Sequence, residues 1–128
     1  MSLTILIVED NVQNRLLMVD ILRIHGFDII EAKDGQEGLQ LAREQQPDLI
    51  LLDMQMPVMD GLEAARRLKA DPGTRAIKIL AITSFAMKGD RERILAAGCD
   101  EYMAKPIDTR QLPVVVRHLL NLDDGHGP

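Results

Sequence analysis

Apolar residues in this chain fall into two patterns, short unbroken runs and longer stretches in which they recur at helical spacing. The clearest run is 49–52, four branched aliphatic residues that follow the Pro47–Asp48 turn and lead directly into Asp53. A short unbroken apolar run between turn signals is typical of a strand buried on both faces of a parallel sheet. Runs of the same kind predict four further strands, at residues 3–8, 27–32, 77–83 and 101–104.

The stretches between these runs have the spacing of amphipathic helices. In the first of them Leu17, Ile21 and Ile24 recur at intervals of three or four residues, Asn11 is a favourable N-cap and Gly26 ends the helix. Five strands alternating with five helices predict an α/β domain with a parallel sheet and right-handed crossovers. The predicted helices cover residues 11–25, 36–45, 61–70, 88–97 and 108–122.

The last predicted helix breaks one local rule. Asp108 is its predicted N-cap, which places Pro113 in the second turn, where a proline removes a backbone hydrogen bond. This helix therefore either begins later than Asp108 predicts or has a distorted first turn.

Composition narrows the class of protein. A chain of 128 residues that is 46% apolar is long enough for one domain with a core and too apolar to be disordered. Its net charge of -5 argues against a nucleic-acid-binding surface. The single Cys99 cannot form an internal disulfide, which suits a reducing compartment, and the apolar runs are too short to span a membrane. We therefore expect a cytoplasmic protein without membrane insertion or direct contact with nucleic acid.

Polar residues end four of the five predicted strands, and parallel strands place their ligands at this edge of the sheet. Three carboxylates in one place repel one another, and such a cluster is typical of a site for Mg²⁺, which prefers oxygen ligands. The residues are Glu9 and Asp10 after the first strand, Asp53 after the third, Thr83 and Ser84 after the fourth, and Lys105 after the fifth.

A cation, a lysine and a hydroxyl around one carboxylate indicate a site for a phosphoryl group. Lys105 and the cation would neutralise the phosphoryl oxygens, Thr83 would donate a hydrogen bond to one of them, and Asp53 would be the nucleophile. Each residue alone has an ordinary explanation, such as a helix cap for Asp10 or a packing role for Tyr102. The combination favours the phosphoryl site.

Long blocks of the chain share the order and spacing of a known family. The sequence closely resembles the receiver domain of bacterial response regulators of two-component signalling, over nearly all of its length. The resemblance implies a flavodoxin-like, doubly wound, five-stranded parallel sheet in the order 2-1-3-4-5 with five helices, a receiver domain at residues 1–122 and a short flexible tail at 123–128. The blocks that carry it are ILIVEDNVQNR, DGQEGLQLA, PDLILLDMQMPVMDG, AITSFAMKGD and GCDEYMAKPI.

The resemblance also implies roles for the residues at the strand ends. Asp53 matches the phosphoacceptor, and Lys105 matches the lysine that binds the phosphoryl group. Glu9 and Asp10 match the acid pair that binds Mg²⁺ or Mn²⁺ together with Asp53 and the backbone carbonyl of Gln55.

Further matches concern the switch and the loops around the site. Thr83 matches the switch hydroxyl, and Tyr102 matches the aromatic residue that changes rotamer when Thr83 moves toward the phosphoryl group. Pro57 and Gly61 match residues that shape the loop below the site, and Pro106 would follow a cis peptide bond.

The function implied is a stand-alone switch without an output domain. A histidine kinase or a histidine phosphotransfer protein would supply the phosphoryl group, and a downstream effector protein would bind the surface of the fourth helix, fifth strand and fifth helix. A phosphorylation-dependent homodimer is a further candidate assembly. Catalysis would be limited to self-phosphorylation and self-dephosphorylation, with Gln55 and Phe85 at positions where the family tunes these rates. Candidate recognition residues are Met87, Arg91, Glu92, Arg93 and Tyr102.

The chain departs from the family pattern at few positions. Ser84 stands where alanine or glycine is frequent after the switch hydroxyl, and Pro113 is unusual in the last helix. Asn11 and Asn14, in the run EDNVQNR, resemble the receivers of hybrid kinases and of single-domain cell-cycle regulators.

Three alternatives remain open from the sequence. The chain could be a receiver detached from a larger hybrid kinase or regulator, with 123–125 as part of a linker. It could be a phosphatase of the haloacid-dehalogenase type, although Gln55 stands where those enzymes carry a second acid. It could be a flavodoxin-like electron carrier, although acids rather than hydroxyls follow the first strand.

Overall fold

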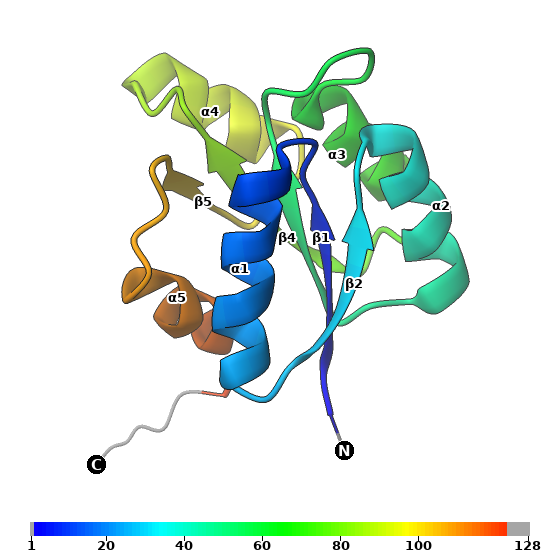
Figure 1. Cartoon of the computed structure of the whole chain (residues 1–128). Coiled ribbons are helices and arrows are strands. Elements are labelled where there is room, and N and C mark those ends of the chain that lie inside the picture. Colours follow the sequence, from blue (N-terminus) through cyan, green and yellow to red (C-terminus); the bar gives the residue numbers. More distant parts are fainter. Residues whose placement is uncertain (1, 123–128) are drawn as a thin grey trace.

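The computed structural model describes residues 2–122, and strands alternate with helices along the whole of this part (Figure 1). The strands are β1 (Thr4–Val8), β2 (Asp28–Ala32), β3 (Leu49–Asp53), β4 (Lys78–Thr83) and β5 (Glu101–Ala104). The helices are α1 (Val12–Ile24), α2 (Gly35–Gln45), α3 (Gly61–Ala70), α4 (Lys88–Ala96) and α5 (Gln111–Leu119). The predicted tail at 123–128 lies outside the described residues. Among helices within 2–122, we find none with the length and apolar character that crossing a membrane requires.

The sheet has the order β2-β1-β3-β4-β5, and its strand pairs are all parallel. This confirms the predicted flavodoxin-like arrangement. The strand order reverses between β1 and β3, which is where such folds place their ligands. The register pairs Val8 with Leu52 and Asp53 with Ile82. Consequently Glu9, Asp53 and Thr83 come from three adjacent strands at one edge of the sheet.

The sheet is covered on both faces, as the unbroken run in β3 predicts. Leu49 and Leu51 pack in a core with residues of α1 and α5, whereas Ile50 and Leu52 pack in a second core with residues of α2, α3 and α4. Figure 1 shows α1 and α5 on one side of the sheet and α2 and α3 on the other. The four residues of β3 before Asp53 are at most 1% exposed. Asp53 therefore ends a strand whose residues are all buried.

Helix α1 has the predicted cap but not the apolar face that its spacing suggests. The Asn11 side chain accepts a hydrogen bond from the Asn14 N–H at 2.9 Å, which confirms the N-cap. Leu17 and Ile24, however, are 42% and 82% exposed. The face that packs on the sheet carries Met18, Val19 and Leu22 instead. Apolar residues cover most of this helix, so spacing alone does not identify the buried stripe.

Helix α5 begins at Gln111, three residues later than Asp108 predicts, and it ends at Leu119. The Asp108 carboxylate accepts hydrogen bonds from the Arg110 and Gln111 N–H groups, and its carbonyl oxygen accepts one from the Leu112 N–H, so Asp108 caps the turn that leads into the regular helix. Pro113 is thereby the third residue of α5. In the first turn of a helix the N–H groups have no intrahelical partner, so the proline removes no bond. Of the two expectations, the late start is the correct one.

Candidate functional site

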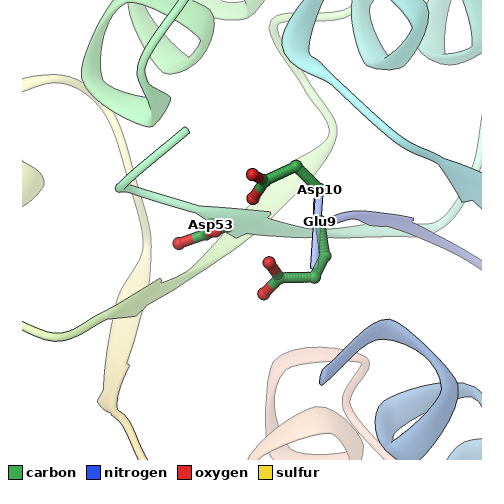
Figure 2. Close-up of side chains that lie close together, drawn as sticks. All are labelled: Glu9, Asp10 and Asp53. Carbon is green, nitrogen blue, oxygen red and sulfur yellow. The ribbon is translucent and has the colours of Figure 1, made fainter. Parts of the chain in front are cut away.

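The three predicted carboxylates lie together at the ends of β1 and β3. Figure 2 shows Glu9, Asp10 and Asp53 around one small space. Oxygen atoms of the three side chains lie within 4.8 Å of one another. Glu9 is 0% and Asp53 1% exposed, whereas Asp10 is open to solvent. The predicted convergence of these side chains is therefore confirmed, with two carboxylates buried and the third at the mouth of the site.

Lys105 brings a positive charge from the end of β5. Its Nζ donates to Asp53 Oδ1 at 3.0 Å and lies 3.5 Å from Glu9 Oε1. The backbone of Lys105 is held by a hydrogen bond from its N–H to the Thr83 carbonyl oxygen. The Lys105–Pro106 peptide bond is cis, as the resemblance implies. One lysine thus bridges the two buried carboxylates.

The charges at this site are not balanced by the protein alone. The pKa of the Glu9 carboxyl is raised to about 7, first by burial and then by its interaction with Asp53, while the Asn11 N–H and Lys105 oppose the shift. Burial by itself lowers the pKa of the Lys105 amine, but the hydrogen bond and the charges of Asp53 and Glu9 outweigh it and raise that pKa. An added cation would relieve the repulsion between the carboxylates.

Two oxygens of the cluster are suited to hold such a cation. Asp53 Oδ2 and Glu9 Oε1 are buried and have no hydrogen-bond partner among the described residues. Asp53 Oδ1, by contrast, accepts from both the Gln55 N–H and Lys105. An unsatisfied buried acceptor costs about 1 to 3 kcal/mol, more for a charged group. The donor set, made only of oxygens, fits Mg²⁺ or Mn²⁺.

Thr83 and Tyr102 occupy the neighbouring strands β4 and β5. Thr83 is 1% exposed, and its Oγ1 is hydrogen-bonded to Phe85 and to the Gln55 side chain. Tyr102 is half-buried, and the Arg91 guanidinium of α4 lies 5.7 Å from the centre of its ring. Thr83 is thus linked to the loop after β3 through Gln55, whereas Tyr102, which pairs with Ala81, contacts α4 through Arg91.

Comparison with known proteins decides the family. The sequence profile of the response regulator receiver domain matches residues 5–117. The chain belongs to this family. The polar-differentiation response regulator DivK of Brucella ovis is 43% identical over 120 residues, which cover 94% of this chain and 98% of that protein.

Solved structures agree with the family assignment of this receiver domain. The receiver domain of a sensor histidine kinase from Pseudomonas aeruginosa, with a magnesium ion coordinated in its active-site cleft, superposes with a TM-score of 0.87 at 35% identity, covering 94% of this chain and 99% of that one. The receiver domain of a histidine kinase from Syntrophus aciditrophicus has a TM-score of 0.86 at 31% identity, covering 98% and 96%. Neither the phosphatase nor the flavodoxin alternative is favoured.

One residue of the site in this receiver domain was missed in the sequence. Arg15 of α1 donates from Nη1 to the Glu9 carbonyl oxygen at 2.8 Å, and its Nε lies 3.1 Å from Glu31 Oε1 of β2. Its side chain is only 16% exposed. Arg15 thus fixes the chain between β1 and α1, from which both Glu9 and Asp10 project. Its place one helical turn after the Asn11 cap is the only sequence signal that could have identified it.

The loop after Asp53 brings α3 close to the end of β3. The Gly61 N–H donates to the Met54 carbonyl oxygen at 3.1 Å. A Cβ at Gly61 would lie 2.4 Å from the Asp53 carbonyl oxygen and 2.6 Å from the Met54 Cα. Only glycine allows this approach without moving backbone. Gly61 therefore has the loop-shaping position that the resemblance implies, and Pro57 precedes it in the same loop.

Proposed function

We propose that this receiver domain accepts a phosphoryl group on Asp53 and that the phosphorylated form presents a changed surface to a partner protein. The observation that carries the proposal is the state of the Asp53 carboxylate. Lys105 and the Gln55 N–H hold Oδ1, while Oδ2 is buried at a charged site without a partner among the described residues. A carboxylate with one oxygen fixed and the other unpaired is oriented for nucleophilic attack.

The proposal includes a divalent cation bound beside Asp53. Glu9, Asp10, Asp53 and the backbone carbonyl of Gln55 would hold Mg²⁺ or Mn²⁺, supported by the two buried carboxylate oxygens without a hydrogen-bond partner among the described residues and by the oxygen-only donor set. The magnesium reported for the Pseudomonas receiver domain supports the choice of ion. When bound, the cation neutralises charge on the phosphoryl oxygens. Arg15 keeps the Glu9–Asp10 segment in place for binding of the cation.

The chain's own groups have distinct parts in the reaction. One carboxylate oxygen of Asp53 forms a bond to phosphorus while the bond from phosphorus to the donor's histidine nitrogen breaks. Lys105 Nζ, already 3.0 Å from Asp53, stabilises the negative oxygens of the phosphoryl group. Thr83 then moves to donate a hydrogen bond to one of those oxygens. Tyr102 follows into the space that Thr83 leaves, which changes the surface above β5.

The surface of α4, β5 and α5 would be the site of recognition. Met87 is 76% exposed at the start of α4, and Arg91 contacts the Tyr102 ring there. Glu92 and Arg93 also lie on α4 and are exposed. A downstream effector protein, or a second phosphorylated copy of this chain, would bind this surface. A histidine kinase or a histidine phosphotransfer protein would supply the phosphoryl group.

We also infer that residues 1–122 form one receiver domain that acts as a stand-alone regulator in the cytoplasm. The 98% coverage of the DivK relative supports the stand-alone role, and the free buried thiol of Cys99 fits a reducing compartment. The domain is proposed to be a switch and not a turnover enzyme. A phosphatase with an aspartate nucleophile needs a general acid or base, and the Gln55 carboxamide cannot take that role.

Labelling by a small phosphodonor tests the phosphoacceptor directly. Incubated with Mg²⁺ and acetyl phosphate, the protein is expected to gain the mass of one phosphoryl group, in a linkage that alkali and hydroxylamine cleave. Asp53→Asn should gain none, because the nucleophile is gone. Asp20→Asn, which changes an exposed carboxylate of α1, is the matched control and should be labelled like the wild type. Equal labelling of Asp53→Asn, or continuous hydrolysis of a phosphomonoester, would contradict the proposal.

Magnesium binding should be visible as thermal stabilisation. Without the cation, the raised pKa of Glu9, about 7, means that the folded state loses stability as the pH rises from 4.5 toward 7 and above. Mg²⁺ should offset this loss, so it is expected to raise the Tm more at about pH 8 than at about pH 6. Scanning calorimetry with and without Mg²⁺ measures the increment. The assigned ligands would be contradicted if Mg²⁺ raised the Tm of Asp53→Asn as much as that of the wild type, or if it raised the wild-type Tm more at the lower pH.

A further inference from the structure

The side chain of Gln55 bridges the loop after β3 and the loop after β4. Its Nε2 donates to Thr83 Oγ1 at 2.9 Å, and its Oε1 accepts from the Ser84 N–H at 2.8 Å. The backbone N–H of the same residue donates to Asp53 Oδ1 at 3.0 Å. One residue thus touches the proposed phosphoacceptor through its main chain and the proposed switch residue through its carboxamide.

The hydrogen bonds on Thr83 leave its hydroxyl no free capacity. Oγ1 accepts from Gln55 Nε2 and from the Phe85 N–H at 2.9 Å, and it donates to the Phe85 carbonyl oxygen at 3.0 Å. A hydroxyl has one proton to donate and two lone pairs to accept with. Thr83 can therefore donate to a phosphoryl group on Asp53 only after it gives up its present bond to Phe85, and moving away also breaks the bond from Gln55.

The loop between β4 and α4 is largely exposed beyond Thr83. Ser84 is exposed, Phe85 and Met87 are 58% and 76% exposed, and α4 buries only Ile94 within its own span. Among the described residues, the two hydrogen bonds of the Gln55 carboxamide are the side-chain hydrogen bonds that join this loop to the loop after β3.

We infer that the Gln55 carboxamide is a positioning residue that holds Thr83 and the β4–α4 loop in the resting arrangement, and thereby sets how readily the domain switches. The inference rests on the proposed function of Asp53 and Thr83. It concerns the side chain of Gln55 and is separate from the backbone carbonyl that would bind the cation. A ligand that binds only the switched arrangement has its apparent affinity reduced by the fraction of molecules already in that arrangement. Removing the carboxamide should raise this fraction.

Beryllofluoride with Mg²⁺, a mimic of the phosphoryl group, is the probe. Gln55→Leu keeps the backbone and most of the volume but loses both hydrogen bonds, and it is expected to bind beryllofluoride about tenfold more tightly than the wild type. Without the probe, the amide NMR signals of Ser84 and Phe85 should move toward the positions that they take in the beryllofluoride complex. Gln55→Ala, which removes the same group, should shift both measurements in the same direction.

Repeating the measurement in the variant Thr83→Val distinguishes an effect of Gln55 through the Thr83 hydroxyl from a general loss of rigidity in the fold. If Gln55 acts by restraining the Thr83 hydroxyl, adding Gln55→Leu to Thr83→Val should give no further tightening. The inference would be overturned if both single Gln55 variants bound beryllofluoride with wild-type affinity. It would also be overturned if Gln55→Leu tightened binding equally with Thr83 and with Thr83→Val. Neither result would affect the phosphoacceptor assignment. A wild-type protein that binds no beryllofluoride and takes up no phosphoryl group would overturn both.

Discussion

Replacing Lys105 with methionine is expected to lower the free energy of unfolding by roughly 3 kcal/mol, because it leaves two buried carboxylates without their shared cation. Lys105 Nζ contacts Asp53 at 3.0 Å and Glu9 at 3.5 Å, and its side chain is only 18% exposed. The loss should be larger at about pH 8 than at about pH 6, since the Glu9 carboxyl, with a pKa of about 7, is ionised at the higher pH. Phosphoryl uptake from a small donor should fall as well, because the group that stabilises the transferred oxygens is gone.

Urea unfolding at the two pH values, without Mg²⁺, measures this effect. The matched control is Lys88→Met, which removes a charge from an exposed lysine at the start of α4 and should change stability little. Mg²⁺ should restore part of the stability of Lys105→Met, because the cation can replace some of the missing positive charge. Equal stability of Lys105→Met and the wild type at both pH values would show that the lysine does not neutralise the buried pair.

The second large effect is expected from Gly61→Ala. The added Cβ would lie 2.4 Å from the Asp53 carbonyl oxygen, so the backbone of α3 or of β3 has to move. Such overpacking costs about 2 to 3 kcal/mol of stability. The shift also displaces Asp53 relative to Lys105, and a displacement near 1 Å at a reacting group slows a reaction by roughly a hundredfold. We therefore expect a lower Tm together with much slower labelling by acetyl phosphate.

Gly89→Ala is the matched control for the glycine prediction. A Cβ at this helical position of α4 meets no atom within 4 Å, so alanine should be neutral or stabilise by about 0.5 to 1 kcal/mol. Calorimetry and labelling rates of the two variants give the comparison. Equal behaviour of Gly61→Ala and Gly89→Ala would show that the close approach between α3 and β3 does not position Asp53.

The sheet and the carboxylate site could be predicted from the sequence because their signals are local. The run 49–52 is apolar at every position, which is typical of a strand covered on both faces, and Asp53 follows it directly. Parallel strands all end at the same edge, so the placement of Glu9, Asp10, Asp53 and Lys105 together follows from the fold alone. The Asn11 cap was predictable for the same reason, since the side chain acts within one helical turn.

Features that depend on packing between distant segments could not be predicted in this way. Which stripe of α1 is buried is decided by the sheet beneath it, and the late start of α5 is decided by the turn in which Asp108 takes part. The contacts of Arg15 with Glu9 and Glu31, and of Gln55 with Thr83, join residues whose sequence positions carry no common pattern. Polar side chains that hold a site in place are found only when the neighbouring segments are seen together.

If Asp53 itself carries the phosphoryl group, chemical reduction should mark this position. Borohydride reduces an aspartyl phosphate to homoserine, so a protein treated with acetyl phosphate and Mg²⁺, then reduced and digested, reports the position of the modification by mass spectrometry. We expect homoserine at position 53 and an unmodified Glu9–Asp10 peptide. Reduction at any other carboxylate, or an intact Asp53 in fully labelled protein, would contradict the phosphoacceptor assignment.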